Sequence, residues 1–200
     1  MTSDYVQDLG AFFTELQRET DRGLPLVAAA LIDEKLLETL QAFLCPGKTS
    51  ERLLTDPNAP LGTFSARIDA CLALALIDEP EYREITLLRK VRNRFAHSKH
   101  GMSFKDEKVV GLCASLESPL PSGERYESAS ARVRFINSTV CIALRLLHRD
   151  KWVKREQRAL KTWVKPEDVG WRSFNDETPP PGSVYVTLGP AGTEVREKKA

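Results

Sequence analysis

Apolar residues recur at steps of three and four along almost the whole chain from Val6 to Val164, and this spacing is the strongest constraint on the fold. It is the period of an amphipathic α-helix, whereas a half-buried strand alternates apolar and polar residues. Runs of β-branched residues bounded by turns are missing before the last part of the chain. The spacing therefore predicts an all-α fold.

Two segments of this pattern stand out. The most apolar one runs from Thr63 to Ile77, and we expect it to form the central helix of the fold. The other begins near Val133, where apolar residues repeat at three- and four-residue steps. We expect a long C-terminal amphipathic helix there, which continues to about Lys165 with room for a bend near Asp150.

The chain changes character after residue 165. Thr178–Gly182 contains three consecutive prolines, and Glu194–Ala200 is mostly charged. With 200 residues, of which 42% are hydrophobic, the chain has apolar mass for one ordinary core. We therefore predict one compact multihelical domain over residues 1–165 and a flexible, irregular tail over 166–200, with the apolar patch at 184–188 as the one candidate for a weak strand.

Charge and targeting patterns exclude several classes of protein. The 29 lysines and arginines nearly balance 28 acidic residues, so the net charge of +1 gives no global attraction to nucleic acid or membrane. The N-terminal residues contain no basic stretch that leads into an apolar one. No apolar run approaches the roughly 20 residues that span a bilayer. We therefore expect a cytoplasmic protein with no membrane partner.

The residues that could hold a metal ion are scattered. His100 and His148 are isolated, and no pair of cysteines has the short spacing of a zinc site or a redox dithiol. We expect no metal ion, no cofactor, and reduced, mostly buried thiols. The chain has four cysteines: Cys45, Cys71, Cys113 and Cys141.

Three separated motifs carry the most specific information in the chain. They are Glu19–Gly23 leading into Val27–Ala30, Pro60–Ile68, and Arg89–His97 followed by Ser103 and Phe104. In order and spacing, these motifs resemble the mannitol operon repressor family over roughly residues 5 to 150. The resemblance implies a compact multihelical bacterial transcriptional regulator that commonly self-associates and lacks an evident helix-turn-helix.

Neither of the two tight junctions between predicted helices suits a pair of DNA-reading helices. The junction at Pro46 and Gly47 leads into a short segment that prolines soon break, and the junction at Asp78–Pro80 leads into an acidic helix start. We therefore predict a non-enzymatic regulator, a homo-oligomer and most simply a dimer, which acts through an unidentified protein partner without reading DNA directly.

The sharpest candidate for chemistry is the run Arg92–His97. Its spacing of arginine and histidine resembles the HEPN superfamily, which implies a metal-independent ribonuclease or toxin that uses Arg92, Asn93 and His97. Histidine can move the 2′-hydroxyl proton, and a guanidinium stabilises charge on phosphorus. On a helix these two side chains lie about 140° apart, so they converge only if the helix ends or distorts near Ala96. The alternative is that they complement a helix C-terminus.

Charged residues within otherwise apolar helices form a second candidate. Charges on a core-facing stripe are tolerated when they are paired, so an internal ion-pair network is the ordinary interpretation. The alternative is an electropositive cleft, lined by Arg67 and Arg92, that binds an anion. The charged residues concerned are Asp21, Arg22, Arg67, Asp69 and Arg92.

Basic residues gather on one face of the last predicted helix, opposite Trp152 and Trp163. Such a face could bind RNA, DNA or an acidic protein partner. The alternative is a solvated outer surface over tryptophans that pack into the body of the protein. The basic residues are Lys151, Lys154, Arg155, Arg158, Lys161 and Lys165.

Overall fold

The computed structural model describes residues 2–98, 101–120, 129–163, 186–189 and 192–195, in two compact units, Met1–Ala159 and Leu160–Ala200. The first unit is helical, which confirms the predicted all-α fold class. Its helices, with one 3₁₀ turn, are α1 (Thr2–Arg18), α2 (Gly23–Phe43), α3 (Lys48–Thr55), α4 (Phe64–Ala73), α5 (Glu79–His97), α6 (Glu107–Ala114), α7 (Ala131–Leu146), α8 (Arg149–Val153) and η1 (Lys154–Glu156). No helix in the described part is long and apolar enough to cross a membrane.

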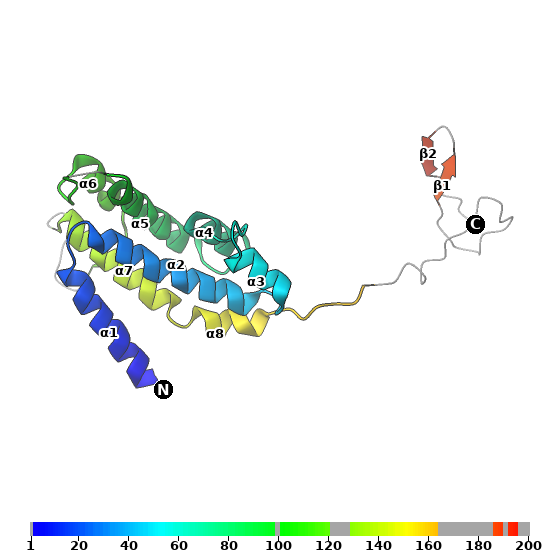
Figure 1. Cartoon of the computed structure of the whole chain (residues 1–200), viewed down its shortest axis with the longest axis horizontal. Coiled ribbons are helices and arrows are strands. Elements are labelled where there is room, and N and C mark those ends of the chain that lie inside the picture. The colour runs from blue at the N-terminus through cyan, green and yellow to red at the C-terminus, as the bar shows by residue number, and fades with distance from the viewer. Residues whose placement is uncertain (1, 99–100, 121–128, 164–185, 190–191, 196–200) are drawn as a thin grey trace. The chain divides into compact units, whose positions relative to one another are not determined.

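Helix α2 is the centre of the first unit. It packs against α1, α3, α4, α5, α7 and α8, and in Figure 1 it lies between α4 and α5 on one side and α7 and α8 on the other. Ile32, Leu36 and Leu40 are fully buried along its length. The prediction that the segment from Thr63 to Ile77 forms the central helix is wrong. α4 spans only ten residues and packs against α2 and α5.

Helix α4 ends four residues earlier than the apolar pattern indicates. Ala75 has a φ of 55°, in the left-handed region that favours glycine. The amide of Leu76 donates to the carbonyl of Cys71 at 2.8 Å, and that of Ala75 donates to the carbonyl of Leu72 at 2.9 Å. This pair of bonds is the Schellman motif, which satisfies the last carbonyls of a helix. The apolar pattern continues past the helix because Leu76 and Ile77 remain buried in the connection.

The helix that begins near Val133 also ends early. α7 stops at Leu146, α8 and η1 follow after a short break, and residues 157–163 are not helical. The predicted continuation to about Lys165 is therefore wrong, and Lys165 itself lies outside the described residues. Just after η1, Gln157 Nε2 donates a hydrogen bond to the carbonyl of Leu44 at 2.6 Å, at the C-terminal end of α2. That bond satisfies a carbonyl that α2 leaves without an intrahelical partner.

The second unit contains a two-stranded antiparallel sheet. β1 (Val186–Gly189) pairs with β2 (Gly192–Val195), with Val186 opposite Val195 and Gly189 opposite Gly192. The candidate strand at residues 184–188 overlaps β1, and a partner strand follows it. The rest of the predicted tail, with its proline-rich run, lies outside the described residues.

Candidate functional site

Helix α5 carries the run Arg92–His97 and is anchored at both ends. At its start, Asp78 and Glu81 form a capping box in which each side chain accepts a hydrogen bond from the other residue's backbone amide. Ile85, Leu88, Val91 and Phe95 then form its buried face. This face fixes the rotation of the helix, so Phe95 points into the core, whereas Arg92, Asn93 and His97 point to the sides of the helix.

Arg92 and His97 do not share a cleft within one chain. α5 continues without a break through His97 and ends at Ser98, so the two side chains stay on different sides of the helix. His97 is exposed and lines a cleft of about 480 Å³ with Lys90 and Arg94. Arg92 lines another cleft, of about 440 Å³, and Asn93 lines both. The geometry that the ribonuclease interpretation requires is thus not formed by a single copy of this chain.

Arg67 points into the protein and not into the cleft that Arg92 lines. Its Nη1 lies 2.9 Å from Oδ1 of Asp33, while its Nε donates to the carbonyl of Leu61 at 3.0 Å and its Nη2 to that of Leu54 at 3.3 Å. These contacts join α4 to Asp33 of α2, to Leu54 of α3 and to Leu61 in the connection before α4. Arg67 therefore makes the internal ion pair that is the ordinary interpretation of such a charge, and it does not accompany Arg92.

The residue that does accompany Arg92 is Arg89, which the sequence analysis did not select. Both arginines line the 440 Å³ cleft from α5, together with Asn93, and Thr63, Phe64 and Ser65 line it from the start of α4. The three-residue spacing of Arg89 and Arg92 was the available signal, since residues three apart share a helix face. The opposite wall is α2, which contributes Leu26, Ala29, Ala30 and Asp33.

The predicted basic face of six residues is not one helical face. Lys151 lies in α8, and Lys154 and Arg155 lie in η1, whereas Arg158 and Lys161 follow in the stretch that is not helical. All five are exposed. The interpretation that tryptophans pack beneath them is wrong for Trp152, which is 60% exposed.

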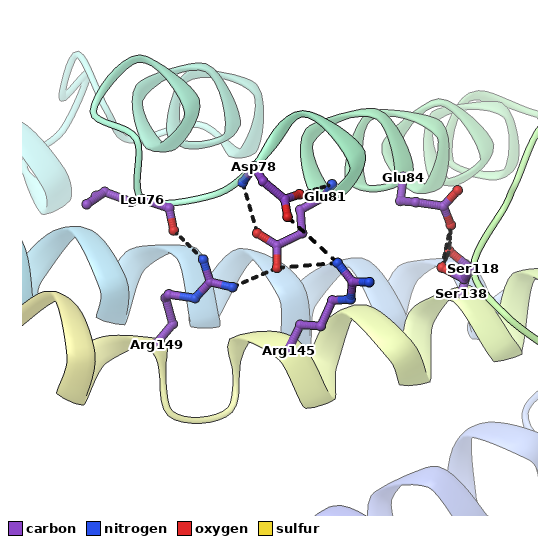
Figure 2. A network of polar contacts seen from close by, with 8 residues as sticks. All are labelled: Leu76, Asp78, Glu81, Glu84, Ser118, Ser138, Arg145 and Arg149. Atoms are coloured by element: carbon purple, nitrogen blue, oxygen red, sulfur yellow. Dashed lines mark hydrogen bonds and ion pairs between the residues drawn. The ribbon is translucent and has the colours of Figure 1, made fainter.

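A buried acidic network joins the start of α5 to α7 and α8 (Figure 2). Glu81 is only 2% exposed, and its Oε1 accepts a hydrogen bond from Nη2 of Arg149 at 2.6 Å, with Nη1 of Arg145 at 4.0 Å. Arg149 Nη1 also donates to the carbonyl of Leu76 at 2.8 Å. Since this carboxylate is both buried and paired, removing either partner would leave an uncompensated charge between the three helices, so we assign it a structural role.

Glu84 forms a second buried network one turn along α5 (Figure 2). Its Oε2 accepts hydrogen bonds from Oγ of Ser118 at 2.7 Å and Oγ of Ser138 at 2.5 Å, and its Oε1 accepts from the amide of Glu117 at 2.7 Å. Three donors satisfy this carboxylate, which lines neither cleft described above. Neither Glu81 nor Glu84 was among the predicted charged residues, because their partners are distant in sequence.

The motifs that carry the family resemblance contact one another or hold neighbouring elements. Arg132 Nη1 lies 2.8 Å from Oδ1 of Asp21, and the amide of Phe104 donates to Oδ2 of the same carboxylate at 3.2 Å. The ring of Phe104 in turn packs against those of Phe95 and Phe135, with centroids 5.1 and 5.5 Å away. The first and third motifs thus meet in space. Asp21 is paired, as expected of a charge near the core, but with a residue that the sequence analysis did not select.

The four cysteines are free thiols in this structure. Cys71 and Cys113 are buried, and burial raises the pKa of each thiol to about 12. Cys45 and Cys141 are partly exposed. Within the described ranges, no group of three or more histidine, cysteine or acidic side chains is placed to hold a metal ion.

No protein-family profile matches the chain, but curated proteins of two Escherichia coli strains are similar to it. The chain is 28% identical to the mannitol operon repressor of Escherichia coli (strain K12) over 119 residues, and equally to that of E. coli O6:H1 (strain CFT073). The chain resembles the mannitol operon repressor. The aligned part is 56% of this chain and 61% of the repressor, so the chain spans about three fifths of the length of the relatives it matches.

This similarity confirms the resemblance that the three motifs predict. Among solved structures, the X-ray structure of the MtlR-HPr complex from E. coli has a TM-score of 0.48 and 22% sequence identity to this chain. That similarity covers 73% of this chain and 98% of the solved chain.

Proposed function

We propose that this chain is a non-enzymatic, oligomeric transcriptional regulator of the mannitol operon repressor kind, which acts through a protein partner and does not read DNA bases itself. The observation that carries this proposal is the 28% identity to the mannitol operon repressor over 119 residues. The hydrogen bond from the amide of Phe104 to Asp21 adds support, because it joins the first and third of the motifs that carry the resemblance.

The junctions between helices support the part of the proposal that concerns DNA. A DNA-reading pair needs two helices joined by a tight turn, with the second presenting polar residues to the bases. After the junction at Pro46 and Gly47, α3 has only eight residues. After the junction that contains Ala75, the first turn of α5 carries Glu79 and Glu81, whose negative charge suits a helix N-terminus but repels phosphate.

The surface around α8 supports a protein partner. Trp152 is 60% exposed, and Arg155 follows it by three residues, so both lie on one side of this helical turn. Exposed tryptophan and arginine are the residues most enriched at the energetic centres of protein interfaces. Lys151 and Lys154 add positive charge beside them, which favours an acidic partner.

A reporter gene placed behind the promoter region of the gene that encodes this chain tests the proposal. We expect repression by the intact chain, and loss of most of that repression in the variant Trp152→Ala/Arg155→Ala. The control is Lys108→Ala, an exposed basic residue of α6, which should repress normally. Circular dichroism melting of each variant checks that the fold is retained.

Experiments with the purified chain test the other two parts of the proposal. We expect no sequence-specific gel shift with the regulatory DNA, and light scattering should give the mass of an oligomer. Tight, sequence-specific DNA binding by the chain alone would overturn the indirect mechanism. A monomer at micromolar concentration would overturn the oligomer.

A further inference from the structure

The cleft between α2, α4 and α5 holds two arginines whose charges are not neutralised by any described acidic side chain. Arg89 and Arg92 both line it, and they share one face of α5. The ion pairs of the described part of the chain use Lys35, Arg67, Arg83, Arg132, Arg145 and Arg149 instead. Among the described residues, Nη1 of Arg92 donates only to Oδ1 of the adjacent Asn93, at 3.1 Å, and Nε of Arg89 is buried with no acceptor. Buried donors of this kind are normally satisfied, so Arg89 Nε is a donor that lacks an acceptor.

The start of α4 adds further donors to the same cleft. Thr63 caps this helix by accepting a hydrogen bond from the amide of Ala66 at 3.2 Å, which leaves the amides of Phe64 and Ser65 without an intrahelical acceptor. Phe64 and Ser65 both line the cleft. The first amides of a helix, together with its dipole, favour an anion at this end.

Among the described residues, the one acidic residue that lines the cleft lies beside a third arginine. Asp33 lines the cleft from α2, and its Oδ1 is 2.9 Å from Nη1 of Arg67, which is close enough for an ion pair although Oδ1 accepts no hydrogen bond from a described residue. The charges of Arg89 and Arg92 therefore remain in excess. Two guanidinium groups and a helix N-terminus match a doubly charged phosphate group, whose oxygens can accept several hydrogen bonds at once.

Apart from Asp33, the α2 wall of the cleft is apolar and consists of Leu26, Ala29 and Ala30. The two alanines leave space beside Leu26, and Phe64 at the start of α4 adds an aromatic side chain. A volume of about 440 Å³ lies in the range of pockets that enclose small ligands, which is about 300–1,000 Å³. The cleft is thus suited to a small organic molecule with a charged group at one end.

We propose that this cleft binds a small phosphomonoester, with the phosphate between Arg89, Arg92 and the start of α4 and the organic part against α2. The inference does not depend on the proposed regulatory function, and it gives the chain a site for a small-molecule signal. Inorganic phosphate tests whether the cleft recognises the phosphate group that all phosphomonoesters share. AMP and glucose 6-phosphate distinguish a nucleotide from a sugar phosphate as the source of the phosphate group.

Isothermal titration calorimetry of the full chain tests the site with inorganic phosphate, AMP and glucose 6-phosphate. Adenosine and glucose, which lack the phosphate group, are the control ligands. We expect at least one of the two phosphomonoesters to bind more tightly than inorganic phosphate, and adenosine and glucose to give no heat. Arg89→Gln and Arg92→Gln should each weaken binding at least tenfold. The matched control is Arg94→Gln, which removes the same charge from the same helix but lines the other cleft.

A second variant keeps the test decisive if the arginine variants fold poorly. Ser65→Asp places a carboxylate in the first turn of α4, where it favours the helix, so the fold should be retained while the anion is repelled. Loss of binding in Ser65→Asp with unchanged helicity supports the proposal. Three results would overturn it: no binding of any phosphomonoester, an equal loss of affinity in Arg94→Gln, or binding of an RNA oligonucleotide without binding of the small ligands.

Discussion

Replacing Arg67 with methionine should lower the free energy of unfolding by about 3 kcal/mol, because its guanidinium links α4 to Asp33 of α2, to the carbonyl of Leu54 in α3 and to the carbonyl of Leu61. Breaking a buried ion pair by removing one partner costs about 3–5 kcal/mol, since the other charge is left uncompensated. The Asp33 side chain is 29% exposed, so water can solvate its carboxylate in part. The lower end of the range is therefore expected. Methionine keeps most of the apolar stem of arginine, which limits the loss of packing.

Urea unfolding followed by far-UV circular dichroism measures this loss. The matched control is Arg83→Met, which removes a guanidinium that is paired with Glu117 on the surface, with side chains 54% and 64% exposed. Exposed pairs contribute about 0–1 kcal/mol, so this control should change stability by less than 1 kcal/mol. The variant Arg67→Met/Asp33→Asn should recover part of the loss, because it removes the uncompensated charge as well. A loss in Arg67→Met no larger than that in Arg83→Met would refute the assignment of Arg67 to a buried structural pair.

Three further predictions follow from single features. Ala75→Gly should raise stability by about 1 kcal/mol and the melting temperature by about 2–4 °C, because glycine adopts the left-handed conformation at that helix end without strain; unchanged melting would contradict this. Cys71 and Cys113 should resist iodoacetamide at pH 8 until the chain unfolds, and rapid labelling of the native chain would contradict this. Because burial raises the pKa of both thiols from 9.0 to about 12, the unfolding free energy should also fall as the pH rises from about 9 toward 12. Single-stranded RNA should stay intact, and His97→Ala should behave like the wild type, because one chain places Arg92 and His97 in separate clefts; cleavage that the substitution abolishes would revive the ribonuclease interpretation.

Part of the candidate site was accessible from sequence. Arg92 was selected as an anion-binding residue because it is a charge in an apolar helix, and it does line a cleft. Arg67 was predicted to line the same cleft as Arg92. Arg67 instead pairs with Asp33 inside the protein, and Arg89 is the second arginine that lines the cleft. Periodicity tells which residues share one helix face, but which partner approaches that face depends on the packing of other helices.

The sequence by itself determined the features that depend on neighbouring residues. The three- and four-residue spacing predicted the all-α class, and the proline and acidic residues at Glu79–Glu81 predicted the start of α5, where a capping box is found. These features were predictable because helix formation and capping are governed by contacts within about one turn of the chain.

Only the tertiary structure decided which helix is central and where the apolar patterns stop being helical. α7 ends at Leu146 although the apolar spacing continues. The segment after it is held by Arg149, bonded to Glu81 at a separation of 68 residues, and by Gln157, bonded to Leu44 at a separation of 113 residues. Hydrogen bonds between such distant residues leave no periodic signal in the sequence. They can nonetheless end a helix, because a buried carbonyl or carboxylate that lacks a partner costs more than one turn of helix contributes.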